Sequence, residues 1–463
     1  MAAQRPDRPP AVETVLVAVR AALQEPREHA VLAAMARAVV AEERARLRDR
    51  QPAARDAARD AATLAADVVR RLEAADRAWT AGLTPVINAT GVVIHTNLGR
   101  AAWPRAAIEA AGAAAADPLL LELDRATGRR GHRYRAAEEL LVRLTGAEDA
   151  LVTNNNAAAV ALAVGLAGRG GGVAVSRGEL VEIGGGVRIP EIVRRAGARL
   201  VEVGTTNRSR AADFEAPLTD GRARLVLRVH RSNFRQEGFT EDPDPVAVAE
   251  LAHAHGALVV DDLGGGALLD TATVGLAHEP QPSERLAAGA DLVTFSGDKL
   301  VGGPQAGLVV GRANLVARLR RDPLARAMRP DKTTLAGVAA TLGLYVSGRA
   351  MADVPVWRML ATSVDALRER AEALARALGE AVAIVDLRST IGGGSLPGET
   401  LPSVGLALRA RSADRLLGRL RTGEPAVVAR IEDGVVVLDL RTVDQARDAD
   451  LAAAVRSALG NPR

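Results

Sequence analysis

From Thr84 onward, short runs rich in β-branched residues alternate with Ala-rich stretches of helical spacing. This alternation predicts an α/β fold with a doubly wound, mostly parallel sheet, because each helix carries the chain back to the edge where its strand began. The runs expected to form the strands are Ala150–Thr153, Val173–Val175, Leu200–Val203, Leu225–Val229, Ala257–Val260, Leu292–Phe295 and Gly307–Val310.

The residues before this core predict a helical N-terminal domain with a linker helix, spanning 1–78. They are rich in Ala, Arg, Glu and Leu, and apolar residues such as Val12, Val15 and Val19 recur at helical spacing. Pro26 and Pro52 interrupt the pattern, so we expect two or three helices followed by a long polar helix through 64–72.

The residues after the core predict a small C-terminal α+β domain. A helix through Thr333–Ser347 closes the expected catalytic core of 79–347, and 348–463 is long enough for a domain of its own. The helices and strands expected there are Val364–Leu378, Ala413–Leu420, Val382–Val385, Ala426–Ile431 and Val435–Leu440.

The bulk composition excludes several classes of protein. The chain has no cysteine, which excludes disulfides, thiolate zinc sites and cysteine nucleophiles. It has no uncharged apolar stretch of about 18 residues and no apolar signal-peptide core, so a cytoplasmic protein is expected. The histidines show no metal-ligand spacing, and no metal site is expected.

A local arginine cluster near the N-terminus leaves two readings open. The formal net charge of +4 is too small to indicate a nucleic-acid partner by itself. The cluster, interleaved with acidic residues, is either a surface for phosphate contacts or a solvated helix face. Its members are Arg44, Arg46, Arg48 and Arg50.

Lysine is almost absent from this chain, which makes the surviving lysines informative. Of the 60 Lys and Arg residues, only Lys299 and Lys332 are lysines. An amine can act as nucleophile, Schiff-base partner and proton carrier, which a guanidinium cannot. Because Lys299 follows a strand-like run and precedes Gly302 and Gly303, we expect it to perform amine chemistry.

The residues around Lys299 in the expected fold match the needs of pyridoxal phosphate. Ser296 is spaced so that its hydroxyl can reach the phosphate while the amine reaches the aldehyde carbon. A carboxylate beside the ring nitrogen keeps the nitrogen protonated. Asp262 is preferred for this role since it leads into Gly264, with Asp261 as the competing choice on the opposite face of the strand.

Two further segments follow strands at the same edge of the sheet. Asn155, Asn156 and Ala157 begin an Ala-rich helix, whose free amides favour a phosphate dianion. His230 follows another strand and is expected either to pack near the ring or to be a structural histidine.

Five motifs closely resemble a known family, the bacterial selenocysteine synthases or L-seryl-tRNA(Sec) selenium transferases. The resemblance covers essentially the whole chain, and one departure is Gly265, where the family commonly has Ser. The motifs are Ile87–Arg100, Ser176–Gly185, Asp262–Gly266, Ser296–Leu300 and Ile391–Gly398.

The resemblance implies a fold-type I pyridoxal phosphate enzyme, related in fold to aspartate aminotransferase, that assembles as a homodecamer of five dimers. It implies Lys299 as the Schiff-base lysine. It also implies that Arg100, Arg326 and Arg329 bind selenophosphate with Asp298 nearby, and that the N-terminal domain binds the selenocysteine tRNA. Arg326 and Arg329 would converge on one anion if Ala325–Met328 were helical.

The activity that the resemblance implies is conversion of L-seryl-tRNA(Sec) to L-selenocysteinyl-tRNA(Sec). Lys299 would remove the α-proton, β-elimination would give dehydroalanyl-tRNA, and selenide from selenophosphate would add to it. Two alternatives stay open: a lyase of the same scaffold that acts on a free amino acid or amino-sugar acid without tRNA, and a tRNA- or partner-binding protein without catalysis. The presence of Lys299 and Asp262 disfavours the second.

Overall fold

The computed structural model describes residues 8–23, 26–48, 58–81, 83–130, 133, 135–183 and 186–460. The chain divides into two compact units, Met1–Pro85 and Val86–Arg463. The helical part therefore extends past the predicted end at 78, because its last helix continues to Ala81. The predicted boundary at 347 stays a prediction, since the residues from Val86 onward form one unit.

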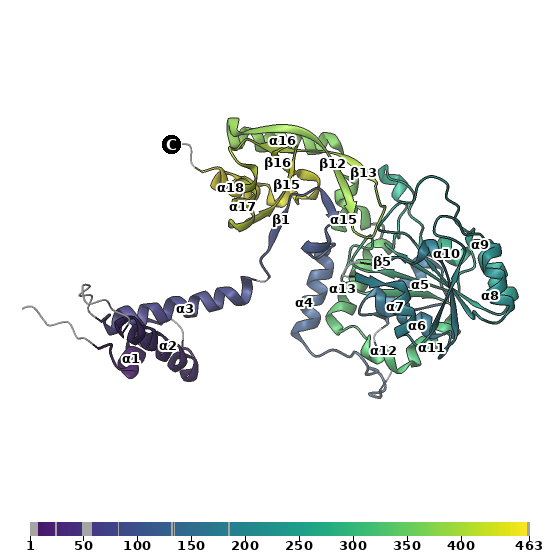
Figure 1. Cartoon of the computed structure of the whole chain (residues 1–463), viewed down its shortest axis with the longest axis horizontal. Helices are drawn as coiled ribbons and strands as arrows, with labels where there is room; N and C mark the ends of the chain where they lie inside the picture. Colours follow the sequence, from purple (N-terminus) through teal and green to yellow (C-terminus); the bar gives the residue numbers. More distant parts are fainter. Residues whose placement is uncertain are drawn as a thin grey trace, which may run out of the picture. The chain divides into compact units, whose positions relative to one another are not determined.

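The N-terminal unit contains three helices in its described residues, α1 (Val12–Ala22), α2 (His29–Arg48) and α3 (Ala61–Ala81) (Figure 1). Pro26 lies between α1 and α2, as the sequence predicts, whereas Pro52 and Arg50 lie outside the described residues. The apolar faces of the helices share one core, formed by Val15, Leu16, Val19, Leu32, Ala36, Val39, Val40, Leu64, Ala65, Val68 and Leu72.

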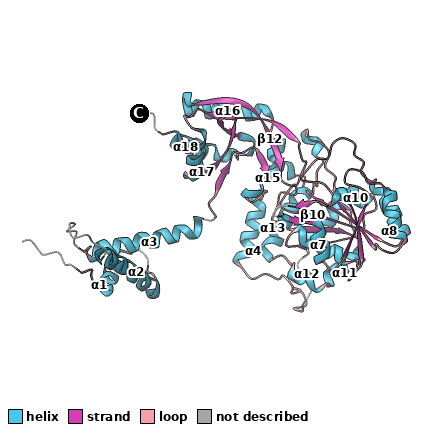
Figure 2. Cartoon of the chain, in the orientation of Figure 1, coloured by secondary structure: helices cyan, strands magenta, loops and turns pink. Residues whose placement is uncertain are grey.

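The larger unit is built on a seven-stranded sheet covered by helices on both faces (Figure 2). Its strands, in spatial order, are β3 (Asp149–Thr153), β11 (Gly307–Gly311), β10 (Leu292–Ser296), β9 (Leu258–Gly264), β8 (Leu225–Val229), β4 (Gly172–Ser176) and β7 (Arg199–Val203). All neighbours from β10 to β7 are parallel, and β11 runs antiparallel to both β10 and β3. The predicted doubly wound, mostly parallel sheet is thus present.

Alternate residues of each strand pack against helices on opposite faces of this sheet. On one face α6 (Asn156–Gly165), α7 (Ile189–Arg195) and α11 (Ala313–Arg321) share a core with side chains such as Val260 and Leu292. On the other face lie α5 (Ala136–Thr145), α13 (Lys332–Val346), α8 (Glu215–Thr219) and α9 (Pro245–Ala254). This alternation decides which face each functional side chain at a strand end can reach.

A second, five-stranded sheet is formed mainly by the C-terminal residues. Its order is β15 (Arg430–Glu432), β16 (Val435–Asp439), β13 (Thr400–Leu408), β12 (Val382–Gly392) and β2 (Val92–Ile94). It packs with α16 (Val364–Leu378), α17 (Ala413–Thr422) and α18 (Asp448–Leu459). β1 (Val86–Asn88) pairs in parallel with β14 (Ala426–Val428), so the first residues of the unit join the C-terminal elements.

Two strand predictions in this region were wrong in detail. The expected strand Ala426–Ile431 is two strands, β14 and β15, because its two halves pair with different partners. The expected Val382–Val385 extends to Gly392 as one arm of a hairpin with β13, which the sequence did not predict.

The remaining elements are short or peripheral to the two sheets. They are β5 (Glu182–Ile183), β6 (Val187–Arg188), α4 (Arg105–Ala116), α10 (Pro282–Ala287), α12 (Pro323–Ala327), α14 (Ala350–Asp353) and α15 (Pro355–Ala361). No helix within the described part of the chain is long and apolar enough to cross a membrane.

Candidate active site

Lys299 lies just beyond the end of β10, in a turn closed by a glycine loop from the C-terminal half of the chain. The residue is 9% exposed, and its Nζ donates a long hydrogen bond of 3.5 Å to the carbonyl oxygen of Gly394. A Cβ at Gly394 would collide with Nζ, and its φ of +87° also favours glycine. Burial lowers the pKa of the Lys299 amine, against the opposing charges of Asp262 and Asp298.

Asp262 on β9 is the buried carboxylate whose charge acts most strongly on the Lys299 amine. Its hydrogen bonds come from neutral groups only. Its Oδ1 accepts from Asn156 Nδ2 at 2.8 Å, from Thr294 Oγ1 at 3.2 Å and from the Gly264 amide at 3.2 Å. Burial raises the pKa of Asp262, because none of these donors carries a charge to offset desolvation. The charge of the carboxylate is therefore not neutralised by its hydrogen-bond donors, and a cationic ligand group could neutralise it.

Asp261 points to the other face of the sheet, as strand geometry requires. Its carboxylate lies 3.6 Å from the Arg285 guanidinium, and Arg228 also acts on it. Of the two aspartates that the sequence left open, Asp262 is the one on the same face as α6 and Asn156.

The start of α6 supplies an open helix N-terminus beside Asp262. Asn155 caps the helix, its Oδ1 accepting from the Ala158 amide at 2.9 Å, and Asn156 and Ala157 are the first helical residues. Their backbone amides have no partner within the helix, which favours an anion there. The Asn156 side-chain Nδ2 donates to Asp262. The Asn156 Oδ1 is buried and has no hydrogen-bond partner among the described residues.

Ser296 and His230 lie at neighbouring strand ends. Ser296 is the last residue of β10 and is buried. The His230 amide donates to the carbonyl oxygen of Asp262 at 2.8 Å, which fixes the histidine backbone beside the carboxylate. Its ring Nε2 is buried without a hydrogen bond and lies 3.4 Å from Glu279 Oε1.

Arg100 reaches the residue next to Lys299. Its Nη1 contacts Asp298 Oδ2 at 2.7 Å, and the Ala101 amide donates to the Asp298 carbonyl oxygen at 3.2 Å. Arg100 itself has a φ of +64°, directly after Gly99 at +88°. Arg100 and Asp298, which the resemblance implied lie near each other at the donor site, thus form an ion pair within one chain, and their role in donor binding stays a prediction.

Arg326 and Arg329 are not brought to Arg100 within one chain. They line a separate cavity of about 680 Å³ together with Glu122 and Thr153. Arg329 Nη1 lies 3.0 Å from Glu122 Oε1. The expected helical turn is present up to Ala327, where α12 ends, and the Met328 amide closes it by donating to the Leu324 carbonyl oxygen at 3.0 Å.

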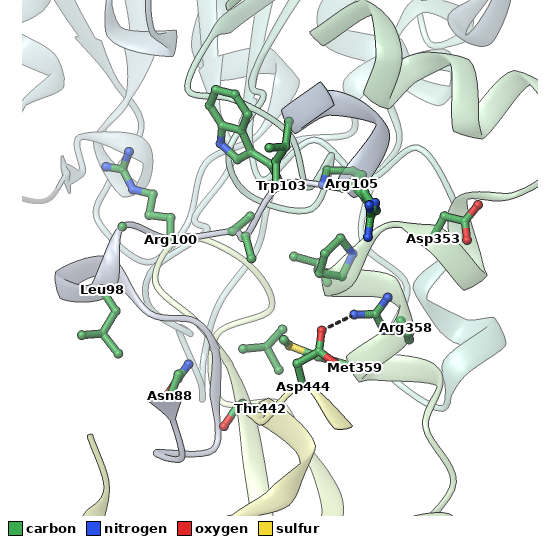
Figure 3. A pocket seen from close by; sticks show the side chains of 18 of the residues that line it. Asn88, Leu98, Arg100, Trp103, Arg105, Asp353, Arg358, Met359, Thr442 and Asp444 are labelled. Carbon is green, nitrogen blue, oxygen red and sulfur yellow. Dashed lines mark hydrogen bonds and ion pairs between the residues drawn. The ribbon is translucent and has the colours of Figure 1, made fainter. Parts of the chain in front are cut away.

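A larger cavity of about 1100 Å³ lies beside the segment that carries Arg100 (Figure 3). Trp103, Arg105, Arg358 and Asp444 line it, and Arg358 Nη2 bonds Asp444 Oδ2 at 2.8 Å. Neither Lys299 nor Asp262 lines this cavity, so its size does not make it the reaction site.

Three contacts of the site come from residues whose roles the sequence did not predict. Thr294 hydrogen-bonds Asp262, Gly394 contacts Lys299, and Glu279 faces His230. Gly394 lies in a motif that the sequence singled out, but its proximity to Lys299 depends on packing between segments 95 residues apart. Nothing in the local sequence marks Glu279 except the proline that follows it.

The groups gathered here fit pyridoxal phosphate. They comprise a buried amine without an acidic hydrogen-bond partner, a buried carboxylate with neutral donors only, a helix N-terminus, and two buried polar atoms without partners. A bound cofactor would supply partners for the first three groups: its aldehyde for the amine, its ring nitrogen for the carboxylate and its phosphate for the helix N-terminus. Among the described residues, no cluster of three or more His, Cys, Asp or Glu could hold a metal ion.

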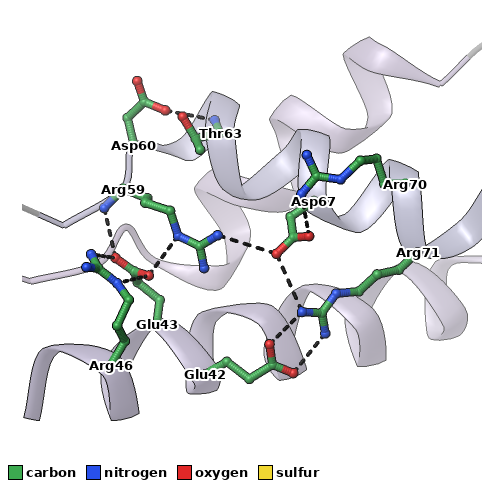
Figure 4. A network of polar contacts seen from close by, with 9 residues as sticks. All are labelled: Glu42, Glu43, Arg46, Arg59, Asp60, Thr63, Asp67, Arg70 and Arg71. Atoms are coloured by element: carbon green, nitrogen blue, oxygen red, sulfur yellow. Dashed lines mark hydrogen bonds and ion pairs between the residues drawn. The ribbon is translucent and has the colours of Figure 1, made fainter. Parts of the chain in front are cut away.

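The N-terminal unit carries the predicted arginine cluster on α2, and Figure 4 shows how part of it is engaged. Arg46 and Arg59 both bond the buried Glu43, at 2.7 Å and 2.8 Å. Arg44 and Arg48 are exposed and make no ion pair with any described residue. Arg46 is therefore structural in part, while Arg44 and Arg48 remain open to an external anion.

Comparison with known proteins identifies close relatives. A family model described as L-seryl-tRNA selenium transferase matches residues 86–444. L-seryl-tRNA(Sec) selenium transferase of Solidesulfovibrio magneticus is 49% identical over 373 residues, covering 77% of this chain and 78% of that relative. The enzyme of the same name from Rhizobium meliloti is 45% identical over 389 residues, covering 82% and 83%.

Among solved structures, D-glucosaminate-6-phosphate ammonia-lyase is similar with a TM-score of 0.60. It is 24% identical, and the match covers 82% of this chain and 97% of that chain. A likeness at this level of identity concerns the fold alone.

Proposed function

Because the chain belongs to the L-seryl-tRNA selenium transferase family, we propose that Lys299 and Asp262 carry out its reaction, the replacement of the seryl β-hydroxyl by selenium. The chain is a transferase of the fold-type I pyridoxal phosphate class and makes selenocysteinyl-tRNA from seryl-tRNA. The observation that carries the residue assignment is the buried Lys299 amine on which the charge of Asp262 acts, with neither group in an ion pair with a described residue.

The chemistry divides between the cofactor and the side chains. Bound pyridoxal phosphate supplies an electron sink for the charge that forms at the substrate α-carbon. Burial lowers the pKa of the Lys299 amine, so the neutral amine is accessible. As a base it can take the α-proton of the substrate and hold it at Nζ. Asp262 provides the carboxylate for the ring nitrogen, with Asn156 and Thr294 holding its Oδ1 in place.

Phosphate binding falls to groups at the two strand ends beside Asp262. The amides of Asn156 and Ala157 at the start of α6 present partial positive charge, and Ser296 offers a hydroxyl from the end of β10. Asn155 holds the helix start in shape through its cap. The phosphate would thus be bound by neutral groups, whereas Lys299 and Asp262 would hold the aldehyde and the ring.

We propose Arg100 as a ligand of the selenophosphate donor, because it is the arginine joined to the residue beside Lys299. Arg326 and Arg329 are proposed as further ligands contributed by a second copy, since they line a separate cavity of their own chain. Guanidinium groups suit a multiply bonded anion. Such a shared pocket needs at least a dimer, and we propose the homodecamer of five dimers that the family resemblance implies.

A selenium-transfer assay tests the proposed function. The full chain, loaded with pyridoxal phosphate, is given selenophosphate with either seryl-tRNA(Sec) or free serine. We expect selenocysteine on the tRNA and no product from free serine. Product from the free amino acid, with none on the tRNA, would instead establish the lyase alternative.

The donor arginines are tested by Arg326→Ala and Arg329→Ala. Each variant should bind pyridoxal phosphate and seryl-tRNA normally but lose on the order of 2–4 kcal/mol of transition-state stabilisation at low selenophosphate, as when one donor is removed from an anion site. Wild-type donor kinetics in both variants would show that these arginines do not bind the donor.

A further inference from the structure

Glu279 is a buried carboxylate beside the candidate active site, and the proposed function gives it no role. Its side chain is 4% exposed and lies between the 3₁₀ turn Thr271–Val274 and α10. The Glu279 amide donates to Thr271 Oγ1 at 2.9 Å, and Thr271 is itself fully buried. Pro280 follows and restricts Glu279 to extended backbone. The backbone therefore holds this carboxylate in one place.

The carboxylate faces a histidine nitrogen that also lacks a partner. Glu279 Oε1 and His230 Nε2 are 3.4 Å apart, slightly too far for a hydrogen bond. Among the described residues, Nε2 is buried and has no hydrogen-bond partner, and its contact with Glu279 Oε1 is the nearest approach that the structure shows between the two side chains. A small rotation of the His230 ring would form a hydrogen bond between the two atoms. Buried polar atoms in proteins generally have such a partner.

His230 connects this carboxylate to the site. Its amide donates to the Asp262 carbonyl oxygen, and its side chain is 24% exposed although Nε2 is buried, so part of the ring other than Nε2 is accessible. A Cβ at residue 265 would lie 2.9 Å from Glu279 Oε1. Gly265 thus leaves the carboxylate uncrowded where a larger residue would press on it.

We propose that Glu279 is a positioning residue that acts through His230. Its carboxylate accepts a hydrogen bond from the Nε2 proton, which fixes the ring orientation and leaves Nδ1 as the acceptor nitrogen toward the bound cofactor. This inference rests on the proposed function only in taking pyridoxal phosphate as the group that His230 faces.

The test measures cofactor release from the loaded full chain, together with the position of its long-wavelength absorbance band. Glu279→Met keeps the length of the side chain but removes the acceptor, and His230→Phe keeps a ring without nitrogens. Each should release pyridoxal phosphate on the order of tenfold faster and shift the band, as when a histidine loses the partner that orients it. The double variant should release it no faster than either single variant, because both changes remove one interaction.

Two further variants separate positioning from simple packing. Glu279→Gln retains an acceptor oxygen and should restore release to near the wild-type rate. Glu284→Met is the matched control, since Glu284 Oε2 lies 3.0 Å from His278 Nε2 in an exposed Glu–His pair; it removes a cap of α10 but should leave cofactor release and the absorbance band unchanged. If Glu279→Met does not fold, Glu279→Asp, with a carboxylate one methylene short, takes its place with the same expected direction.

Wild-type release and spectrum in Glu279→Met, or multiplied effects in the double variant, would overturn the proposal. The measurement uses neither tRNA nor selenium. A chain that fails to transfer selenium yet shows these shifts would contradict the proposed function and leave the role of Glu279 intact.

Discussion

Glu43 in the N-terminal unit and Asp262 beside Lys299 are both fully buried carboxylates, but their partners differ. Glu43 is bonded by two guanidinium groups, and the Arg46 hydrogen bond lowers its pKa to about 2 despite burial. Asp262 receives only neutral donors, and burial raises its pKa. The first charge is neutralised by the protein itself, whereas the second is left for a ligand to neutralise.

The two lysines repeat this contrast. Lys332 is half-buried at the start of α13, with Nζ donating to the Asp117 carbonyl oxygen at 2.7 Å. Lys299 is buried with one long hydrogen bond. Desolvation without compensation is costly for a structural residue and useful for a reactive one, since it moves the pKa toward the working range.

The largest expected effect comes from Lys299→Arg, which preserves charge but cannot form an imine. Selenium transfer should fall on the order of 10⁴-fold or more, as for loss of a central catalytic group. The bound cofactor should also lose its long-wavelength absorbance. Lys332→Arg is the matched control and should retain both properties. Equal losses in the two variants would remove the contrast between the lysines.

Asp262→Asn should come next, because the uncharged amide cannot keep the ring nitrogen protonated. We expect turnover to fall on the order of 10²–10³-fold with the fold retained. Asp261→Asn, on the opposite face, should instead cost about 1–3 kcal/mol of stability, because Arg285 loses its carboxylate partner while Arg228 keeps its ion pair with Glu179. Turnover per folded molecule and denaturant midpoints distinguish the two aspartates, and exchanged phenotypes would reverse their assignment.

Glu43→Gln should destabilise the N-terminal unit by about 1–3 kcal/mol, since Arg46 and Arg59 lose their shared acceptor. The pKa of Glu43 is lowered in the folded state, so its contribution is complete above the ordinary carboxyl pKa of 4.5 and is lost as pH falls toward about 2. Helix unfolding of the isolated unit, followed between these pH values, measures it. A variant as acid-sensitive as the wild type would contradict this role.

Removing residues 1–85 should leave a folded, cofactor-bound unit with much weaker tRNA binding.

The smallest effect is expected from substitutions of the exposed arginines of α2. In the full chain, Arg44→Ala with Arg48→Ala should reduce the slope of log affinity against log salt by about two, one for each phosphate contact. Arg37→Ala, elsewhere on the same helix, should leave the slope unchanged, and an unchanged slope in the double variant would favour the solvated-face reading.

How much the sequence could predict depended on whether the deciding contacts are local. Strand β8 and helix α16 have the predicted bounds, since β8 is apolar at every position except Arg228 and α16 has a clear apolar stripe. Strand β13 was missed because Pro402 and Gly405 interrupt its pattern. Pairing with β12, the other arm of the hairpin, stabilises β13 although its own sequence pattern is weak.

The site shows the same division. Ser296 with Lys299, and Asn155 with Ala157, lie within one strand end or helix start, so spacing alone brings them together. Glu279 and Gly394 reach the site through long-range packing that no local pattern encodes. The separation of Arg326 from Arg100 within one chain likewise depends on the tertiary fold.

The most direct test of the central claim is to find which amine carries the cofactor. The chain loaded with pyridoxal phosphate is reduced with borohydride, which fixes the cofactor to the lysine that holds it, and is then cleaved at arginines and mapped by mass spectrometry. The buried, uncompensated amine predicts label on the peptide that contains Lys299 and none on the peptide that contains Lys332. Label on Lys332, or an unlabelled Lys299 in a cofactor-loaded chain, would contradict it.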